Sequence, residues 1–142
     1  MLLSTETSLT FNGSLTAMTD TGDAVAAYWA ATEARDWDTF GALLAEDVVY
    51  ELPQTRERVR GRAAYTTFTA DGFPGDWHII VQRVIGGEQD AASEIEFIDA
   101  GVGQTGLTFF EFGSYGLISR ITDYWPEPYE PPANRAGLAE RY

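Results

Sequence analysis

Five ionisable side chains stand inside segments that otherwise have the composition of β-strands or strand ends. They are Glu51, His78, Glu94, Glu96 and Asp123. Unpaired charge is costly in a strand interior, so several such residues in a short chain predict that the strands form the wall of a pocket. Carboxylates that share one apolar pocket cannot all ionise freely, so one of them should keep its proton near neutral pH. Such a carboxyl group beside a histidine could carry out general acid–base chemistry.

Strand alternation indicates which of the acidic side chains share a face. Glu94 and Glu96 have the same parity and lie opposite Ile95 and Phe97. They either line the pocket or face water, because many antiparallel sheets have one solvated face. Asp123 shares its face with apolar neighbours, which favours a place in the pocket wall.

Two further candidates have less decisive surroundings. Glu51 shares its strand face with Val49, whereas His78 opens its strand after a tryptophan. His78 is the only side chain whose unperturbed pKa lies near neutral pH, so it is either an acid–base group or a half-buried strand-end residue.

The composition excludes several classes of function. With 22 acidic and 9 basic residues, the net charge of −13 opposes binding to nucleic acid and to anionic membranes. The chain has no cysteine and one histidine, so we expect no disulfide, no thiolate nucleophile and no metal site built from cysteines or several histidines. All basic residues are arginines, which excludes a lysine Schiff base. The N-terminal residues lack a signal-like pattern, and we expect a cytoplasmic protein.

The chain is organised as helices first and strands afterwards. TDTGD provides helix caps before residues 24–34, RDWDTFGALLAED predicts a second short helix, and a third is expected over 62–70. Strands are predicted over 48–52, 77–86, 92–101, 107–113 and 117–125, with polar loops at 54–61 and GVGQTG. The predicted fold class is α+β, with N-terminal helices packed on one face of a strongly curved, mainly antiparallel sheet.

We expect one folded domain with two flanking segments. Residues 1–18 are interpreted as an N-terminal extension, with an edge strand around Ser8–Phe11 as an alternative. Residues 19–126 form the domain, and residues 127–142 form a Pro-rich C-terminal strap. Between helix and strand signals, four arginines alternate at positions 56, 58, 60 and 62. They either dock an anionic group or compensate the acidic surface around them.

Several segments resemble the SnoaL-like branch of the nuclear-transport-factor-2-like superfamily. The resemblance is carried by YWAATEARDWDTFGALLAEDVVYELP, GRAAYTTF and the final ITDYW, and it covers about residues 20–125. It implies a cone-shaped α+β barrel with an apolar pocket between the helices and the concave sheet, usually in a homodimer. Members include polyketide cyclases, ketosteroid isomerase, epoxide hydrolases, dehydratases and binding proteins.

The resemblance gives mixed results when it is carried over residue by residue. Tyr28 matches the helix-one tyrosine that donates to the oxyanion in ketosteroid isomerases. Their general-base aspartate falls at Leu52, and their second oxyanion donor falls at about Thr108. Steroid isomerisation by that mechanism is therefore disfavoured.

The hydrolase and cyclase branches imply other residue sets. Limonene-type epoxide hydrolases use two aspartates bridged by an arginine. Asp123 resembles one of these aspartates, and Glu96 can stand for the other. Glu94 occupies the position of the arginine, so the motif is broken there. SnoaL-type cyclases place a histidine and an aspartate in the pocket, and His78 with Asp123 are the available pair.

We therefore predict a pocket that binds a small, largely apolar or polycyclic molecule and performs cofactor-free acid–base catalysis. The predicted catalytic residues are Tyr28, Glu51, His78, Glu96 and Asp123. The predicted ligand-binding residues are Trp29, Phe68, Glu94, Phe110 and Trp125, although such aromatic residues are more often core. The alternative is a non-catalytic domain that binds or senses a small molecule. A third possibility is a purely structural dimerisation module. We also expect a homodimer formed through the strands LTFFEFG and LISRITDYW.

Overall fold

The computed structural model describes residues 20–142. The predicted N-terminal extension, with its alternative strand around Ser8–Phe11, lies outside the described residues. None of the helices within residues 20–142 is long and apolar enough to cross a membrane.

The first helix, α1 (Thr21–Ala34), begins and ends where its local chemistry requires. Asp20 caps it by accepting a hydrogen bond from the backbone N–H of Asp23 at 2.9 Å. Arg35 ends it in the left-handed conformation, with φ 56°. Between these ends, the buried residues, which include Tyr28 and Trp29, recur at helical spacing, and several of the positions between them are alanines.

Two shorter helices follow. Asp36 caps α2 (Trp37–Ala42), whose Phe40 is fully buried. Helix α3 (Arg62–Gly72) buries Tyr65 and Thr69, which lie one turn apart and point to the same side. All three predicted helices are therefore present, and α3 extends two residues beyond its predicted end. The second helix is shorter than predicted, because it ends at Ala42 and Leu44 already belongs to a strand.

Within residues 20–142, six strands form one sheet in the order β3-β2-β7-β6-β5-β4. Their bounds are β2 (Leu44–Leu52), β3 (Glu57–Arg60), β4 (His78–Gly86), β5 (Asp90–Asp99), β6 (Val102–Phe112) and β7 (Ile118–Tyr124). Strands β4 to β7 form the predicted antiparallel meander, and β2 pairs in parallel with β7. Among the described strands, β3 and β4 are the outermost, so the sheet they form is curled but not closed.

Two predicted loops are in fact strands. Residues 54–61 contain β3, which pairs with β2 from Leu52↔Glu57 to Val49↔Arg60. In the GVGQTG segment, residues 102–106 belong to β6, where they pair with β5 up to Asp99↔Val102. In both segments, backbone pairing with a neighbouring strand overrides a polar or glycine-rich local composition.

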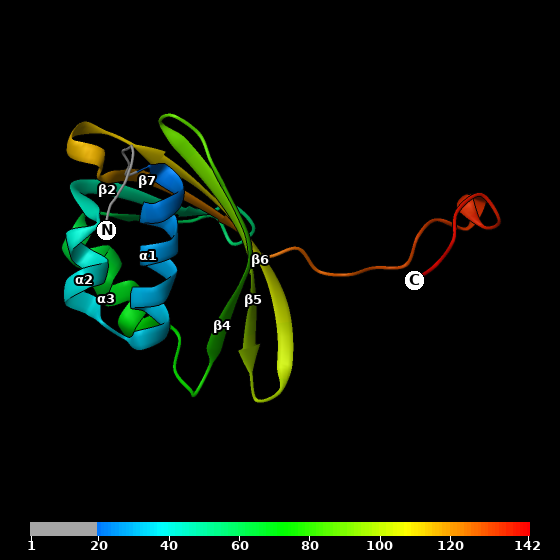
Figure 1. Cartoon of the computed structure of the whole chain (residues 1–142). Coiled ribbons are helices and arrows are strands. Elements are labelled where there is room, and N and C mark those ends of the chain that lie inside the picture. The colour runs from blue at the N-terminus through cyan, green and yellow to red at the C-terminus, as the bar shows by residue number, and fades with distance from the viewer. Residues whose placement is uncertain (1–19) are drawn as a thin grey trace, which may run out of the picture.

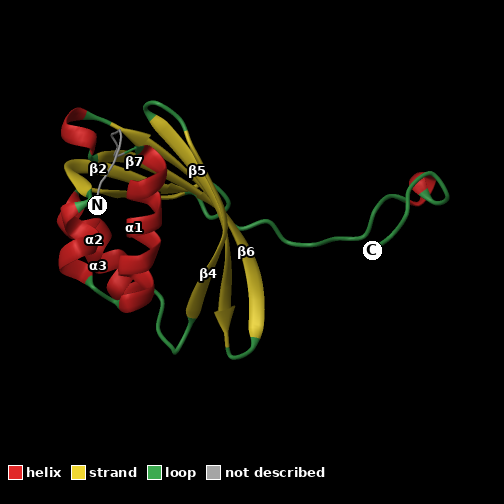
Figure 2. Cartoon of the chain, viewed as in Figure 1, coloured by secondary structure: helices red, strands yellow, loops and turns green. Residues whose placement is uncertain are grey.

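Figures 1 and 2 show the two layers, with the three helices packed against one face of the curved sheet. The core between the layers is centred on Phe40, Phe110, Ile95 and Ile121, each at most 1% exposed. On the opposite face of the sheet, which we call the outer face, none of the helices within residues 20–142 is packed. The C-terminal strap leaves the domain on the side of this outer face (Figure 1).

Candidate functional site

A narrow pocket lies between the helices and the inner face of the sheet. Its wall is mostly aromatic and combines side chains from α1, α3, the segment before β4, and four strands. The free volume is about 40 Å³, which accommodates only a few water molecules. A bound organic molecule would therefore have to displace some of the lining side chains.

Asp123 is the single acidic side chain in the described wall of this pocket, and it is 5% exposed. Its Oδ2 accepts a hydrogen bond from the Tyr50 hydroxyl at 2.6 Å. Its Oδ1 accepts one from the Thr108 hydroxyl at 2.8 Å. A carboxylate has about four acceptor positions, so one of them stays available for a ligand after the contacts with Tyr50, Thr108 and Trp125.

Burial raises the pKa of Asp123 above its usual range. The hydrogen bonds from Tyr50, Thr108 and Trp125 favour the charged form and oppose this shift, but burial has the larger effect. A carboxyl group with a raised pKa can release or take up a proton closer to neutral pH than an exposed aspartate can.

Three tyrosines surround the carboxylate. The hydroxyls of Tyr28 and Tyr65 form a short hydrogen bond, and the Tyr65 ring stacks on Tyr50 with centroids 4.4 Å apart. Burial raises the pKa of all three phenols, and the nearby Asp123 charge adds to this rise. These hydroxyls therefore stay protonated and act as hydrogen-bond donors rather than as bases.

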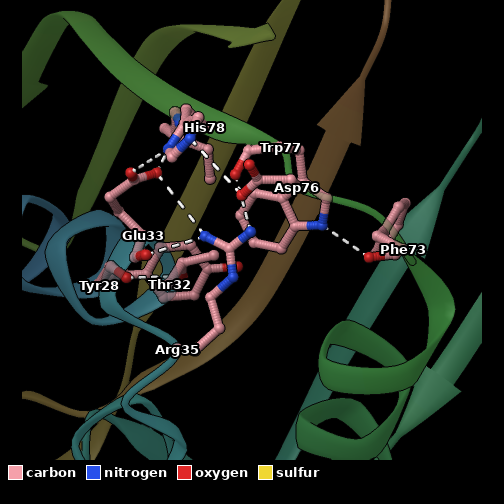
Figure 3. A network of polar contacts seen from close by, with 9 residues as sticks. Tyr28, Thr32, Glu33, Arg35, Phe73, Asp76, Trp77 and His78 are labelled. Atoms are coloured by element: carbon pink, nitrogen blue, oxygen red, sulfur yellow. Dashed lines mark hydrogen bonds and ion pairs between the residues drawn. The ribbon is translucent and has the colours of Figure 1, made fainter. Parts of the chain in front are cut away.

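His78 lies outside the pocket, on the rim between the end of α1 and the start of β4. Its side chain is 58% exposed, and its Nδ1 lies 2.8 Å from Oε2 of Glu33 (Figure 3). The neighbours Trp77 and Ile79 line the pocket, so alternation directs His78 away from it. The expected pairing of His78 with Asp123 is therefore not formed.

The rim contacts instead attach α1 to β4. Glu33 also accepts a hydrogen bond from the backbone N–H of Ile79 at 2.7 Å. The Arg35 guanidinium lies 3.4 Å from the centre of the Trp77 ring and donates to the Trp77 carbonyl at 2.7 Å (Figure 3). Hydrogen bonding to Glu33 raises the pKa of His78. These contacts hold Trp77 in the pocket wall.

The other predicted acidic residues lie on the outer face. Glu51 forms ion pairs with Arg58 at 2.6 Å and Arg120 at 2.8 Å. Glu94 pairs with Arg83 at 3.0 Å, and Glu96 has the same parity as Glu94. Glu51, Glu94 and Glu96 therefore do not line the pocket, contrary to the prediction. The register of β2 and β5 directs the residues next to them in the chain, such as Tyr50 and Ile95, toward the helices instead.

The predicted aromatic residues divide between the pocket and the core. Tyr28, Trp29 and Trp125 line the pocket. Phe110 is fully buried beneath Tyr28, with ring centroids 5.2 Å apart, and Phe68 packs behind Tyr50 at 5.5 Å. Phe68 and Phe110 thus support pocket residues without belonging to the wall.

Sequence reasoning missed Tyr50 and Tyr65 as site residues. Tyr50 shares its parity with Val48 and Leu52, which are buried. The apolar alternation of VVYEL could therefore have placed Tyr50 inward and Glu51 outward. Thr108, which aligned with an oxyanion donor, instead donates its hydroxyl proton to Asp123.

Within residues 20–142, no group of three or more histidine, cysteine or acidic side chains is arranged to hold a metal ion. The polar side-chain groups of the described pocket wall are tyrosine and threonine hydroxyls, tryptophan N–H groups and the carboxyl group of Asp123. Among the groups of this wall, Asp123 is the one whose raised pKa suits it to exchange a proton.

Comparisons with known proteins agree with this fold. A protein from Kribbella flavida described as a candidate ketosteroid isomerase has 43% sequence identity, covers 86% of this chain and 89% of its own, and gives a TM-score of 0.82. An LEH-like epoxide hydrolase from M. tuberculosis has 25% identity over 76% of this chain and 84% of its own, with a TM-score of 0.64. A candidate polyketide cyclase from Xanthomonas campestris has 27% identity over 75% and 90%, with a TM-score of 0.63.

No match was found among the curated proteins. The family model described as the SnoaL-like domain matches residues 25–121, which is more than half of the chain. The chain therefore belongs to the SnoaL-like family of proteins with the nuclear-transport-factor-2-like fold.

Proposed function

We propose that this protein binds a small, largely apolar organic molecule and transfers a proton to or from it through Asp123, without a cofactor. The observation that carries the proposal is a buried carboxyl group, with a raised pKa, in an otherwise aromatic pocket. An environment that keeps a carboxyl group close to its protonated form is a recurring device for acid–base catalysis.

The hydroxyl groups suggest which chemistry Asp123 would perform. One proton of the Tyr28 and Tyr65 pair is used in their mutual hydrogen bond, which leaves one hydroxyl proton for a ligand. A carbonyl oxygen placed there would gain a donor as negative charge develops on it. Asp123 could then remove a proton from the carbon next to that carbonyl and return it elsewhere. Isomerisation, cyclisation and dehydration of a carbonyl compound all use this step.

Epoxide hydrolysis of the two-aspartate type fits the described pocket less well. That mechanism requires a second carboxylate and a bridging arginine, and neither lines the pocket within residues 20–142. Glu96, the residue that could stand for the second aspartate, lies on the other face of β5. The proposal is therefore restricted to single-carboxylate proton transfer.

The proposal can be tested with 2-tetralone, a bicyclic ketone with acidic hydrogens next to its carbonyl. Binding is followed by tryptophan fluorescence, and hydrogen–deuterium exchange at the ketone is followed by NMR in D₂O. We expect the wild type to accelerate exchange over buffer by roughly 10²- to 10⁴-fold, the usual effect of a general base. Asp123→Asn should abolish this acceleration and leave affinity within about threefold. Glu94→Gln, on the outer face, is the matched control and should exchange as the wild type does.

A non-catalytic binding domain is the second candidate, and one observation favours it. Both oxygens of Asp123 already accept hydrogen bonds, as those of a purely structural buried carboxylate would. Binding of 2-tetralone with exchange no faster than in buffer would support the binding domain and refute catalysis on such ketones.

We also propose a homodimer that forms through the outer face. Phe109, Ile85 and Ile80 are about half exposed there, and Tyr124 packs edge-on against Phe109. Cross-strand pairs join Ile85 to Ala92 and Ala92 to Phe109, so the apolar side chains form a continuous row. Exposed apolar rows of this kind are typical of protein–protein interfaces.

A further inference from the structure

The C-terminal strap is locally ordered but packs against nothing else in the described chain. Residues 126–142 are almost entirely exposed, with Tyr129 at 85% and Leu138 at 82%. The strap nevertheless has its own structure. It contains a 3₁₀ turn, η2 (Ala133–Arg135), and an ion pair joins Glu130 before this turn to Arg141 after it at 3.3 Å. An ordered segment that exposes large apolar side chains has a surface suited to a partner.

Trp125, just before the strap, is firmly attached to the domain. Gln54 donates from Nε2 to the Trp125 carbonyl at 2.9 Å, and the Trp125 backbone N–H donates to Oε1 of Gln54. From there the strap runs away from the sheet on the side opposite the helices (Figure 1). Four of the six prolines lie within residues 126–142, and they restrict the unbound chain, so docking costs less conformational entropy.

The direction and reach of the strap fit a second copy of the chain. A protein seated on the outer face would lie beside the strap. Residues 126–132 in extended form span about 20 Å, whereas packed sheets are about 10 Å apart. The strap is therefore long enough to pass the interface and lie along the edge of the second copy.

Charged side chains without a partner among the described residues indicate which edge of the second copy the strap would bind. In the folded body, the side chains of Arg56 and Arg60 have no ion pair or hydrogen bond with any of residues 20–142. Both belong to the edge formed by β3 and the turn before it. Glu127 at the start of the strap likewise has no ion-pair partner among the described residues. In a chain with a net charge of −13, this arginine edge is suited to an acidic segment.

We propose that the strap of each chain docks along the β3 edge of a second copy, with Glu127 facing Arg56 and Arg60. This exchange of straps rests on the homodimer proposed above. It gives a role to the alternating arginines and to the exposed tyrosine and leucine of the strap, none of which contacts the pocket.

The first test measures the dimer dissociation constant by sedimentation equilibrium. Deletion of residues 127–142 should weaken the dimer by at least about tenfold. An exposed ion pair contributes roughly a two- to fivefold change in affinity, so Glu127→Arg and Arg60→Glu should each weaken the dimer by about that factor. The double variant should regain wild-type affinity. A dimer that is unaffected by the deletion, or charge reversals without mutual rescue, would overturn the proposal.

The second test asks whether the contact joins two chains. Because the sequence has no cysteine, an engineered pair forms the only available disulfide. A mixture of Glu127→Cys and Arg60→Cys chains should give a heterodisulfide of twice the chain mass under mild oxidation. Asp38→Cys, exposed on α2, replaces Arg60→Cys as the control and should not cross-link. A chain with both cysteines that forms an internal disulfide as a monomer would overturn the exchange. The ketone exchange assay is independent of both results.

Discussion

Replacing Tyr50 with phenylalanine isolates the interaction on which the site depends. The substitution removes one hydroxyl, which donates to Oδ2 of Asp123 at 2.6 Å inside the fold. A hydrogen bond to a charged group contributes about 1.5–3 kcal/mol, and a buried acceptor without its partner keeps the cost of desolvation. At this chain length, 1 kcal/mol corresponds to about 3–4 °C in Tm. We therefore expect Tyr50→Phe to lower Tm by roughly 5–10 °C when Asp123 is ionised.

The loss should depend on pH in a definite direction. Burial makes the folded pKa of Asp123 higher than its unfolded value, so the neutral form is favoured on folding. The stabilisation associated with that neutral form is present at low pH and is lost as pH rises through the raised pKa. The Tyr50 hydroxyl offsets part of this loss by bonding the carboxylate. Tyr50→Phe should therefore raise the pKa of Asp123 further and should cost less at low pH, where a neutral hydrogen bond contributes about 1 kcal/mol.

Thermal unfolding from about pH 3.5 to pH 8.5 measures both effects, and a double-mutant cycle with Asp123→Asn separates the pair from its surroundings. Asp123→Asn should remove most of the pH dependence of the Tyr50→Phe effect. Tyr124→Phe, on the outer face, is the control and should shift Tm by less than about 2 °C. A Tyr50→Phe loss that is the same at both ends of the pH range would refute an ionisable Asp123 as the partner of this hydroxyl.

Three further predictions follow from the core, the rim and the outer face. Phe110→Ala should destabilise the fold by about 3–5 kcal/mol in chemical denaturation, because Phe110 is fully buried and its removal leaves a cavity. The contact with Glu33 raises the pKa of His78, so the stability that this ion pair contributes should be complete below pH 6.5 and lost as pH rises through the raised pKa. Glu33→Gln should flatten this part of the profile of Tm against pH. An unchanged profile would refute the rim contact. Phe109→Glu should shift the mass in light scattering from twice the chain mass toward 15.6 kDa, whereas a monomeric wild type would contradict the dimer.

Local signals were sufficient for the elements and for part of the site. Asp20 and Asp36 mark the starts of α1 and α2, because an aspartate before a helix satisfies free N–H groups through its own side chain. Alternation correctly placed Glu94 and Glu96 on one face, opposite Ile95. These relations depend on neighbours in the chain, so the sequence alone determined them, together with the α+β class and the family resemblance.

The tertiary structure alone decided which face of each strand meets the helices. A shift of one residue exchanges the two faces of a strand. The alternation of β2 separates Tyr50 from Glu51, but only the packing shows that the face of Tyr50 meets α3 and Asp123. The partners of Asp123 are 73 and 15 positions away in the chain, at Tyr50 and Thr108. His78 was expected beside Asp123 but binds Glu33, because the start of β4 lies at the end of α1. The sequence determined which residues could do acid–base chemistry, whereas long-range packing decided that Asp123 alone among these acidic candidates is buried in the pocket.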